Sequence, residues 1–574
     1  MKMKASTSRK LRYGGITAFL TALIIAVVIV ANVIFSALSQ KLLWYTDLTP
    51  DELFTVSDEC FALIRDGDSS FEDATSPIEK IDEIRAEKLA ADPSFDASSL
   101  KINIIFCDDE DKWNADMTTS QYIYYTARQL EAEFPDYIQL HFVNIVHNPT
   151  RLTKYGAYDN ANIIIEFGTE FRLRTITDFF VANDEESDPW AYNGEKMFAS
   201  AIMAVTRAES PVACLTTNHG ETLPGGDEFL KTLYHAGFDV KTLDLQNEEI
   251  PNTCRLIVVY NPMKDFLTAD GEVSDVDEIQ KLDDYLDGGN SMMVFMSPDP
   301  EVLGTKRLDN FEDFLEEWGI VFDRLTEVQT NPAGGVSMLN HPYMVIDHSQ
   351  SLTADGLTVE GEYVTNGFGG SVTQYMREDS SAPMMIFPNA MSISYSTRFD
   401  TVYYQSEDGE GEGYWYGKSS NSGTYRNIYD IFVTSENAIA RANGDESQDK
   451  KATATDPLKL MTVTKEDRHV TENNDTGSSI NNASYVFACG SGDFGASSIL
   501  QKQSYGNTQF LEYALRIIGQ EPVPVGLGIN VFYDDTIDTV TTAEATRITV
   551  ILAVIPALAA IVCGTVVIVR RKYR

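Results

Sequence analysis

The chain has 574 residues, and its 86 Asp and Glu against 44 Lys and Arg give a formal net charge of −42 at pH 7. Nucleic-acid binding needs a basic surface, so this acidity excludes nucleic acid as the main partner. Hydrophobic residues make up 43% of the chain, which is enough to build buried cores and excludes a disordered acidic polymer. Six cysteines in a chain of this length exclude a disulfide-dense scaffold.

The two ends of the chain carry basic residues without acids, next to uncharged runs at 16–38 and 548–569. A helix needs about 20 apolar residues to cross a bilayer core, so these runs predict one transmembrane helix at each end. The first run is longer than the apolar region of a signal peptide, which favours an uncleaved anchor. By the positive-inside rule, residues 1–15 and 570–574 are cytoplasmic basic tails. Residues 39–547 are then expected outside the membrane.

The region after a juxtamembrane spacer at 39–100 alternates between strand-like and helix-like patterns. Short apolar runs with the length of buried strands alternate with segments that carry apolar residues at helical spacing, which favours mainly parallel sheets covered by helices. The sequence thus predicts two adjacent α/β units, at 101–207 and 208–324. The strands are expected at 102–106, 138–146, 162–167, 212–216, 239–243, 256–260 and 291–296, and the helices at 120–134, 194–207, 226–236, from 274 and from 309.

The amino-acid composition of the chain changes at about residue 325. From 325 to 480 Gly, Ser, Asn, Thr and Tyr dominate and helical periodicity disappears, which predicts a β-rich, partly mobile insertion. Residues 481–520 return to a strand and a helix that complete the second α/β unit. Residues 521–547 are interpreted as a linker to the membrane.

An ordered set of motifs resembles a known family. The motifs are YTDLTPDELFTVSDE at 45–59, NPTRLTKYG at 148–156, NGEKMFASAIMAVTRAESPVACLTTNHGE at 193–221, NPMKDFLTADGEVSDVDEIQKLDDYLDGGNSMMVFMSPDP at 261–300 and YGNTQFLEYAL at 505–515. Together with the two terminal apolar runs, this set resembles the GldG-like auxiliary subunits of gliding-motility-type ABC transporters. The resemblance covers most of the chain except about 325–480.

The resemblance implies a function and partners. Members of this family accompany an ABC permease and an ATPase, and their extracytoplasmic α/β domain is non-catalytic, which implies a transport subunit of the bacterial cytoplasmic membrane without a cofactor of its own. Such a domain is expected to bind cargo, cell-wall material or a partner. Family members often read Gly-His-Gly-Glu where this chain has Asn218, His219, Gly220 and Glu221.

Polar loops follow four of the predicted strands. In open α/β sheets, ligands bind outside the carboxyl ends of the strands, so parallel strands would bring these loops to one edge. The residues expected to line a cleft there are Asn218, His219, Glu221, Asn261, Asp299 and Asp493. They suit a polar ligand, such as a sugar or cell-wall fragment, or a cation held by the carboxylates. The alternative is that His219 caps the following helix and the other residues form turns.

Motifs of catalysis are absent from the sequence. It contains no G-x-S-x-G elbow, no H-E-x-x-H and no G-x-x-x-x-G-K-[ST] phosphate loop, so nucleotide hydrolysis is expected in a partner. No Cys/His spacing suits a zinc site, and Cys214 lies inside a predicted strand as a small buried side chain. Two alternatives stay open: a membrane-anchored wall-polymer hydrolase or transferase that uses His219 with Glu221 or Asp299, and a passive structural or adhesion module.

Overall fold

The computed structural model describes most of the chain between residues 54 and 532. The described ranges are 54–68, 75–115, 119–182, 188–207, 209–269, 276–298, 307–330, 336–377, 382–405, 412–419, 424–442, 446–471, 479–502, 504–518 and 523–532, with 23, 26–31, 34, 562, 566 and 569–570. The chain divides into two compact units, Met1–Asn530 and Val531–Arg574. Nearly all described residues, and both of the large sheets, belong to the first unit.

The first sheet has four strands in the order β2-β1-β3-β4. β1 runs parallel to β2 but antiparallel to β3, and β3 and β4 form an antiparallel hairpin, so this sheet is mixed. The elements of this part are α2 (Asp58–Asp66), α3 (Pro77–Ala91), β1 (Ile102–Phe106), α4 (Glu110–Trp113), α5 (Thr119–Glu133), β2 (Ile138–Phe142), α6 (Pro149–Leu152), β3 (Asn162–Phe167), β4 (Glu170–Thr175), β5 (Phe180–Val181), β6 (Ala191–Tyr192) and α7 (Gly194–Thr206).

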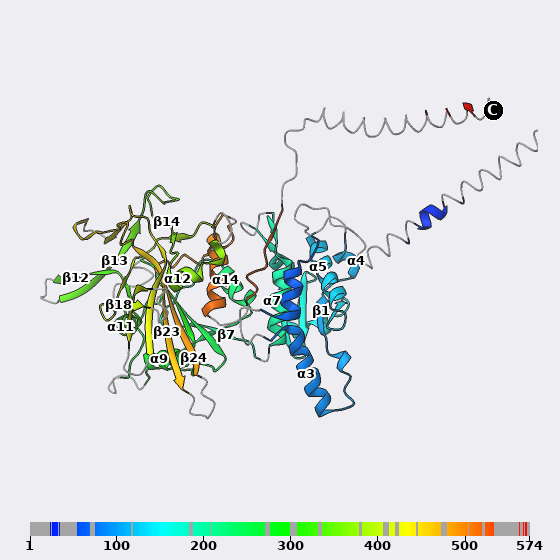
Figure 1. The fold of residues 1–574 in the computed structure, drawn as a ribbon, viewed down its shortest axis with the longest axis horizontal. Helices are drawn as coiled ribbons and strands as arrows, with labels where there is room; N and C mark the ends of the chain where they lie inside the picture. The colour runs from blue at the N-terminus through cyan, green and yellow to red at the C-terminus, as the bar shows by residue number, and fades with distance from the viewer. Residues whose placement is uncertain are drawn as a thin grey trace, which may run out of the picture. The chain divides into compact units, whose positions relative to one another are not determined.

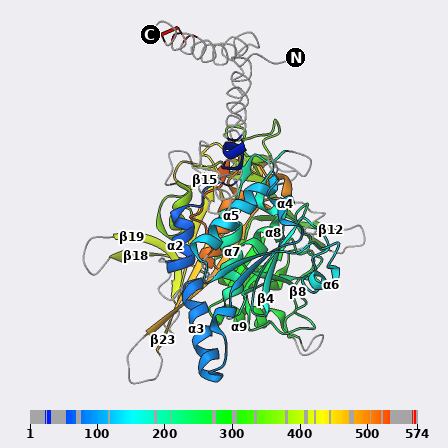
Figure 2. The same ribbon diagram turned by 90° about the vertical axis from the view of Figure 1, so that its right-hand side faces the viewer.

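Helix α7 is the centre of this part. Almost every one of its 13 residues is buried, because it packs on β3 and β4 and is covered by α2, α3 and α5 (Figures 1 and 2). A helix that is apolar on all sides is stable only when it is enclosed. The one buried cation on it, Lys196, is paired with Glu512 of α14 (Asn507–Ile518), so this ion pair joins the first sheet's helices to the elements of the second sheet.

The second sheet begins with five parallel strands in the order β24-β10-β9-β7-β8. Their apolar runs match the predicted strands, since β7 and β8 have the predicted bounds and β9 and β10 differ by one or two residues. The elements here are β7 (Val212–Thr216), α8 (Glu228–His235), β8 (Asp239–Leu243), β9 (Cys254–Tyr260), α9 (Glu278–Asp287), β10 (Ser291–Phe295), α11 (Asp309–Glu317), β24 (Ser479–Cys489), α13 (Ser497–Leu500) and α14.

Helices cover both faces of these parallel strands, in three layers. Side chains alternate between the faces along a strand, so Leu256 and Val258 of β9 join a core with α8 and α14, whereas Ile257 and Val259 join a second core with α9 and α11. Cys214 lies in the second core as a buried side chain.

The fold class predicted from the sequence is wrong about the sheets, which are not mainly parallel. Strand β24 pairs with β10 in parallel on one side and with β23 antiparallel on the other, so the same sheet continues as β23-β20-β19-β18 (Figure 1). The region predicted as an insertion is therefore largely the antiparallel half of a 12-stranded sheet. The antiparallel half consists of β11 (Ile320–Phe322), β15 (Glu362–Tyr363), β17 (Ile393–Tyr395), β18 (Asp400–Gln405), β19 (Glu412–Ser419), β20 (Thr424–Val433) and β23 (Lys459–Thr471). Smaller sheets are formed by β12 (Arg324–Thr330), β13 (Val336–Ile346), β21 (Ile439–Ala442) and β22 (Lys450–Lys451), by β14 (Thr358–Glu360) and β16 (Ile386–Pro388), and by β25 (Asn530–Val531) with β6 and β5. The region also contains the helix α12 (Gly367–Val372).

The predicted fold class is also contradicted at the chain ends. Within the described residues, no helix has both the length and the apolar character needed to cross a membrane. A span needs about 20 continuous apolar residues, and only short pieces of 16–38 and 548–569 are among the described residues.

Candidate functional site

The predicted site lies at the carboxyl edge of the five parallel strands. Numbered along the chain, these strands have the spatial order 2-1-3-4-5, so the order reverses between β7 and β9. Such a switch point is where doubly wound sheets usually bind ligands. Asn218, His219 and Glu221 follow β7, and Asn261 follows β9, so four of the predicted residues lie at this point.

The crevice at this switch point is occupied by the chain itself. The backbone N–H groups of Met263 and Lys264 both donate to the carbonyl oxygen of His219, each at 2.8 Å. A Cβ added to Gly220, whose φ is +77°, would lie 3.2 Å from the Cβ of Met263. The loop after β9 therefore packs directly on the loop after β7.

His219 is the centre of a buried cluster that includes a carboxylate absent from the prediction. Its Nδ1 lies 2.9 Å from Oε1 of Glu221, and its Nε2 lies 3.1 Å from both oxygens of Glu278. Glu278 opens α9 and is fully buried, and His219 is 1% exposed. The imidazole also lies flat against the ring of Phe266, with centroids 3.8 Å apart.

Backbone donors complete the cluster. Glu221 accepts from the N–H of His219 at 2.8 Å, and Glu278 accepts from the N–H of Leu267 at 2.7 Å. The three side chains thus connect the loop after β7, the loop after β9 and the start of α9. His219 does not cap the following helix, because the N-cap of α8 is Asp227 and the side-chain bonds of His219 go to carboxylates.

The cluster favours a protonated imidazole. Burial lowers the pKa of His219, but the hydrogen bonds and negative charges of Glu221 and Glu278 outweigh burial and raise the pKa to about 9. For Glu221, burial raises the pKa, and the bond to His219 together with its positive charge lowers it by more, so the net pKa is below its ordinary value. Both ring nitrogens are then donors to carboxylates, and neither is free to accept a proton from a substrate.

The other predicted residues occupy different environments at the same edge. Asn218 is exposed in a left-handed conformation, φ +88°, and its amide donates to Asp244 at 3.1 and 3.2 Å. Asn261 is buried, also at positive φ, and its amide donates to the carbonyl of Thr222 at 3.5 Å. Both residues therefore form turns, as in the alternative interpretation.

Asp493 lies in the loop after β24 and is exposed, and it accepts a hydrogen bond from Asn389 at 3.2 Å. A Cβ on the preceding Gly492 would lie 2.5 Å from the amide nitrogen of Asn261 and 2.9 Å from Cβ of Ser297, so the loops after β9, β10 and β24 meet closely. Asp299 lies outside the described residues. In the part of the chain that the structure describes, no group of three or more His, Cys, Asp or Glu side chains could hold a metal ion.

Glu278 and Phe266 were missed because they carry no distinctive local signal. An acid in the first turn of a helix is common, since it interacts favourably with the helix dipole, and Glu278 looks like such a residue in sequence. Its buried contact with His219 spans 59 positions of the chain. The helix expected from residue 274 begins later than predicted, because its N-cap is Asp277.

The N-cap of α9 gives a stability prediction. The side chain of Asp277 accepts from the backbone N–H of Gln280 at 2.8 Å, so Asp277→Ala is expected to lower the free energy of unfolding by about 1 kcal/mol. Chemical denaturation of the full chain measures this loss. Asp284→Ala on the same helix removes only a side-chain bond to Gln280 and is the matched control; an equal loss in both variants would contradict the capping role.

Comparisons with known proteins do not identify a family. No family model matches the chain, and no curated protein matches it. Among solved structures, one titled "mmIFT52 N-terminal domain" is similar over 54% of this chain and 97% of its own, with 12% identity and a TM-score of 0.31. Another, titled "Structure of PurLQS from Thermotoga maritima", is similar over 54% of this chain and 100% of its own, with 10% identity and a TM-score of 0.21. At these TM-scores, neither similarity indicates a function.

Proposed function

We propose that this chain is a non-catalytic auxiliary subunit of an ABC transporter at a bacterial cytoplasmic membrane. Two lines of reasoning support the proposal. The first is the ordered set of motifs that resembles the GldG-like family, including the segments at 193–221 and 261–300, which contain α7, β7, α9 and β10. The second is the state of His219, which is the observation that carries the proposal.

His219 is the residue on which a hydrolase or transferase mechanism would depend. A general base must come within hydrogen-bond reach of the proton that it abstracts. Here the imidazole is 1% exposed, is covered on one face by Phe266, and has a carboxylate at each ring nitrogen. These contacts favour a role in fixing the loops of the sheet edge over a role in a reaction, so the hydrolase alternative loses its proposed base.

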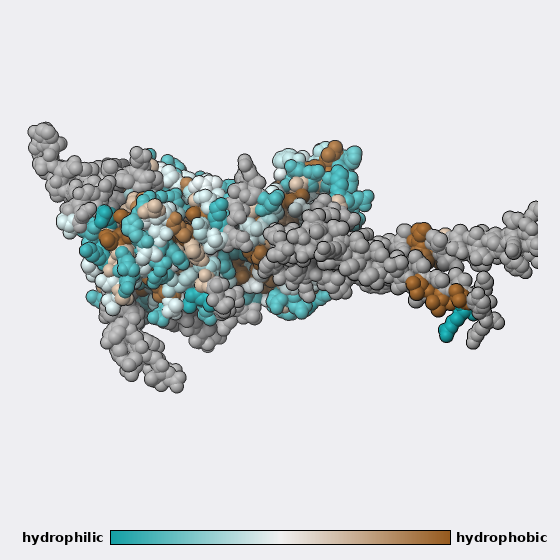
Figure 3. Space-filling view, turned by 90° about the horizontal axis from the view of Figure 1, so that it is seen from above, coloured by the Kyte–Doolittle hydropathy of each residue, from teal (hydrophilic) through white to brown (hydrophobic). Residues whose placement is uncertain are grey.

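A fixed sheet edge suits binding of a partner or of polar cargo. Its exposed groups include Asn218 and Asp493, and Met263 is 39% exposed beside them in the loop after β9. On the face shown in Figure 3, hydrophobic residues are scattered among hydrophilic ones. Asn218 and Asp493 are polar, so recognition at the carboxyl edge would be mainly through polar contacts.

Co-purification tests this proposal. We expect the tagged full-length chain, extracted in several mild detergents, to recover a multi-span permease and an ATPase with a phosphate loop in constant proportions. Asn218→Ala with Asp493→Ala leaves the buried cluster intact and tests whether the carboxyl edge is the contact. Recovery of the wild-type chain alone in every detergent would contradict the transporter proposal and would favour a passive structural module.

A further inference from the structure

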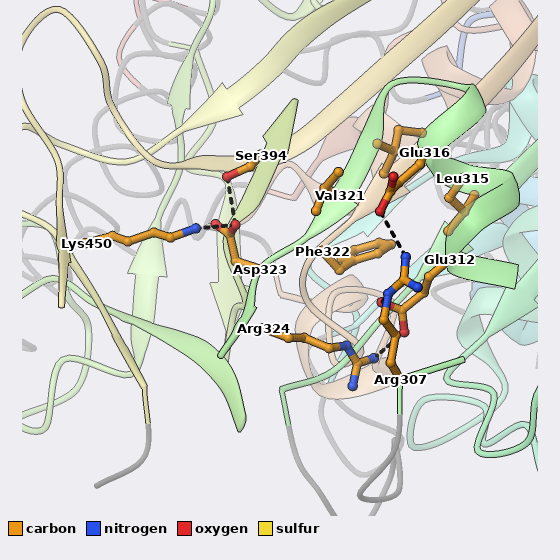
Figure 4. A pocket seen from close by; sticks show the side chains of 11 residues that line it. Arg307, Glu312, Leu315, Glu316, Val321, Phe322, Asp323, Arg324, Ser394 and Lys450 are labelled. Carbon is orange, nitrogen blue, oxygen red and sulfur yellow. Dashed lines mark hydrogen bonds and ion pairs between the residues drawn. The ribbon is translucent and has the colours of Figure 1, made fainter. Parts of the chain in front are cut away.

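A cavity of about 360 Å³ lies away from the sheet edge, where α11 meets β11, β12, β17 and β22 (Figure 4). Its walls carry both signs of charge. The basic residues are Arg307, Arg324 and Lys450, and the acidic residues are Glu312, Glu316 and Asp323. Because charged groups seldom line a cavity without partners, the hydrogen bonds of each wall residue indicate what the cavity can bind.

The acidic side chains that line the cavity already accept hydrogen bonds or form ion pairs. Asp323 is buried and accepts from the hydroxyls of Ser392 at 2.6 Å and Ser394 at 2.7 Å, and it is paired with Lys450. Glu316 lies 2.9 Å from Nη2 of Arg307. These contacts, several of which are visible in Figure 4, leave little capacity for a bound cation.

Arg324 differs from the other wall residues. Its side chain is 4% exposed, and Nη2 lies 3.1 Å from Oε1 of Glu312, which balances its charge. That contact is not aligned as a hydrogen bond, and both Nε and Nη2 are buried without an acceptor. The carboxylate of Glu312 is also engaged by the backbone N–H of Leu308 at 3.0 Å.

The two unsatisfied nitrogens form one side of the guanidinium group. Their N–H bonds are nearly parallel, in the fork arrangement that matches the two oxygens of a carboxylate or phosphate. A buried donor without an acceptor destabilises the fold, because its desolvation is not compensated. An oxyanion that reaches this fork would remove that cost. Lys450 supplies a second cation at the same cavity and is 40% exposed, so its remaining N–H groups are accessible.

From this juxtaposition we propose that the cavity between α11 and β12 binds a small ligand through a carboxylate or phosphate group, with Arg324 as the bidentate anchor and Lys450 as the second contact. The ligand would supply the hydrogen-bond acceptor that Glu312, an ion-pair partner only, does not provide to the fork. This site does not depend on the proposed transporter function, since it involves neither the carboxyl edge of the parallel strands nor a partner subunit.

Binding of two simple probes tests the inference. Inorganic phosphate and sodium acetate are titrated into the full-length protein by calorimetry, and the thermal midpoint is followed at constant ionic strength against chloride. We expect saturable binding of at least one probe and a rising midpoint. Binding of acetate alone would indicate a ligand with a carboxylate, and binding of phosphate alone a ligand with a phosphoryl group. Binding of both would indicate a site that recognises either oxyanion.

Variants decide whether the binding belongs to this cavity. Arg324→Gln combined with Glu312→Gln removes both buried charges together and protects the fold; we expect affinity to fall by about tenfold or more. Lys450→Gln is expected to weaken binding less. The matched control is Arg65→Gln with Glu133→Gln, an exposed pair elsewhere, which should bind normally. Absence of binding of both probes to the wild type, or undiminished binding in the Arg324 and Glu312 variant, would overturn the proposal.

Discussion

Replacing His219 with Ala is expected to lower the free energy of unfolding by about 3–5 kcal/mol. Removing one partner from a buried ion pair leaves the other charge without compensation, and here two carboxylates, those of Glu221 and Glu278, would be left. The variant also loses the packing of the imidazole on Phe266. Equilibrium denaturation in urea or guanidinium chloride measures the loss.

The control for this experiment is an exposed histidine on the same chain. His147 is exposed, so His147→Ala is expected to change stability by less than about 0.5 kcal/mol. Glu278→Gln keeps the shape of the side chain but removes one charge, and its loss should be smaller than that of His219→Ala. A loss in His219→Ala no greater than that in His147→Ala would show that the cluster does not hold the loops together.

The same cluster predicts how stability depends on pH. His219 has a pKa raised to about 9 in the folded protein, against about 6.5 in an unfolded chain. Its contribution to stability is therefore fully present below pH 6.5 and is lost as the pH rises through about 9. The contribution is on the order of 3 kcal/mol, because each pKa unit corresponds to about 1.4 kcal/mol. His219→Gln should remove this fall in stability between pH 6.5 and 9, and an unchanged pH dependence would contradict the assignment.

Local apolar patterns were sufficient to predict most strands and helices of the α/β parts. β1, β3, β7 and β8 have the predicted bounds, and α7 differs from its predicted helix by one residue at its end. A short uncharged run between turn residues indicates a buried strand, whether the neighbouring strands are parallel or antiparallel to it. The direction of those neighbours is not encoded in the run itself. This is why β1 and β3 were expected to be parallel but are antiparallel.

The antiparallel half of the second sheet was not predicted from the sequence, for a similar reason. Strands β23 and β24 pair over 11 residues from Met461↔Cys489 to Thr471↔Ser479, but only the apolar end of β24, from Tyr485 to Cys489, resembles a buried strand in sequence. The outer half of each strand is polar and offers no apolar alternation. Likewise, the position of His219 was predictable from the strand before it, whereas its partner Glu278 depends on tertiary packing of α9.

Arg174 is a buried cation that is expected to lower stability. It lies on β4, is fully buried, and its Nε and Nη2 have no hydrogen-bond partner. Among the described residues, no carboxylate forms an ion pair with it. Burial lowers the pKa of Arg174 by more than the neighbouring Tyr234 and Asp178 raise it, so burial disfavours the charged form. Its contacts are a bond from Nη1 to the carbonyl of Leu173 at 3.4 Å and the ring of Tyr234 at 4.8 Å.

We therefore expect Arg174→Met to raise the free energy of unfolding by about 1–4 kcal/mol, the range found when buried ion pairs are replaced by apolar side chains of similar volume. Burial of a charge destabilises the folded state by several kcal/mol even after relaxation. The cation–π contact with Tyr234 stabilises it by about 2 kcal/mol at most, so the penalty of burial is the larger contribution. Thermal and chemical unfolding of the full chain measure the gain.

Arg172, two positions earlier on the same strand, provides the matched control. Its Nη2 lies 3.1 Å from Asp239 and donates to the hydroxyl of Ser210 at 3.0 Å. Arg172→Met removes satisfied contacts and is expected to lower stability by about 1 kcal/mol, the opposite sign to Arg174→Met. If both variants lose stability equally, the buried guanidinium of Arg174 is not a net cost to the fold.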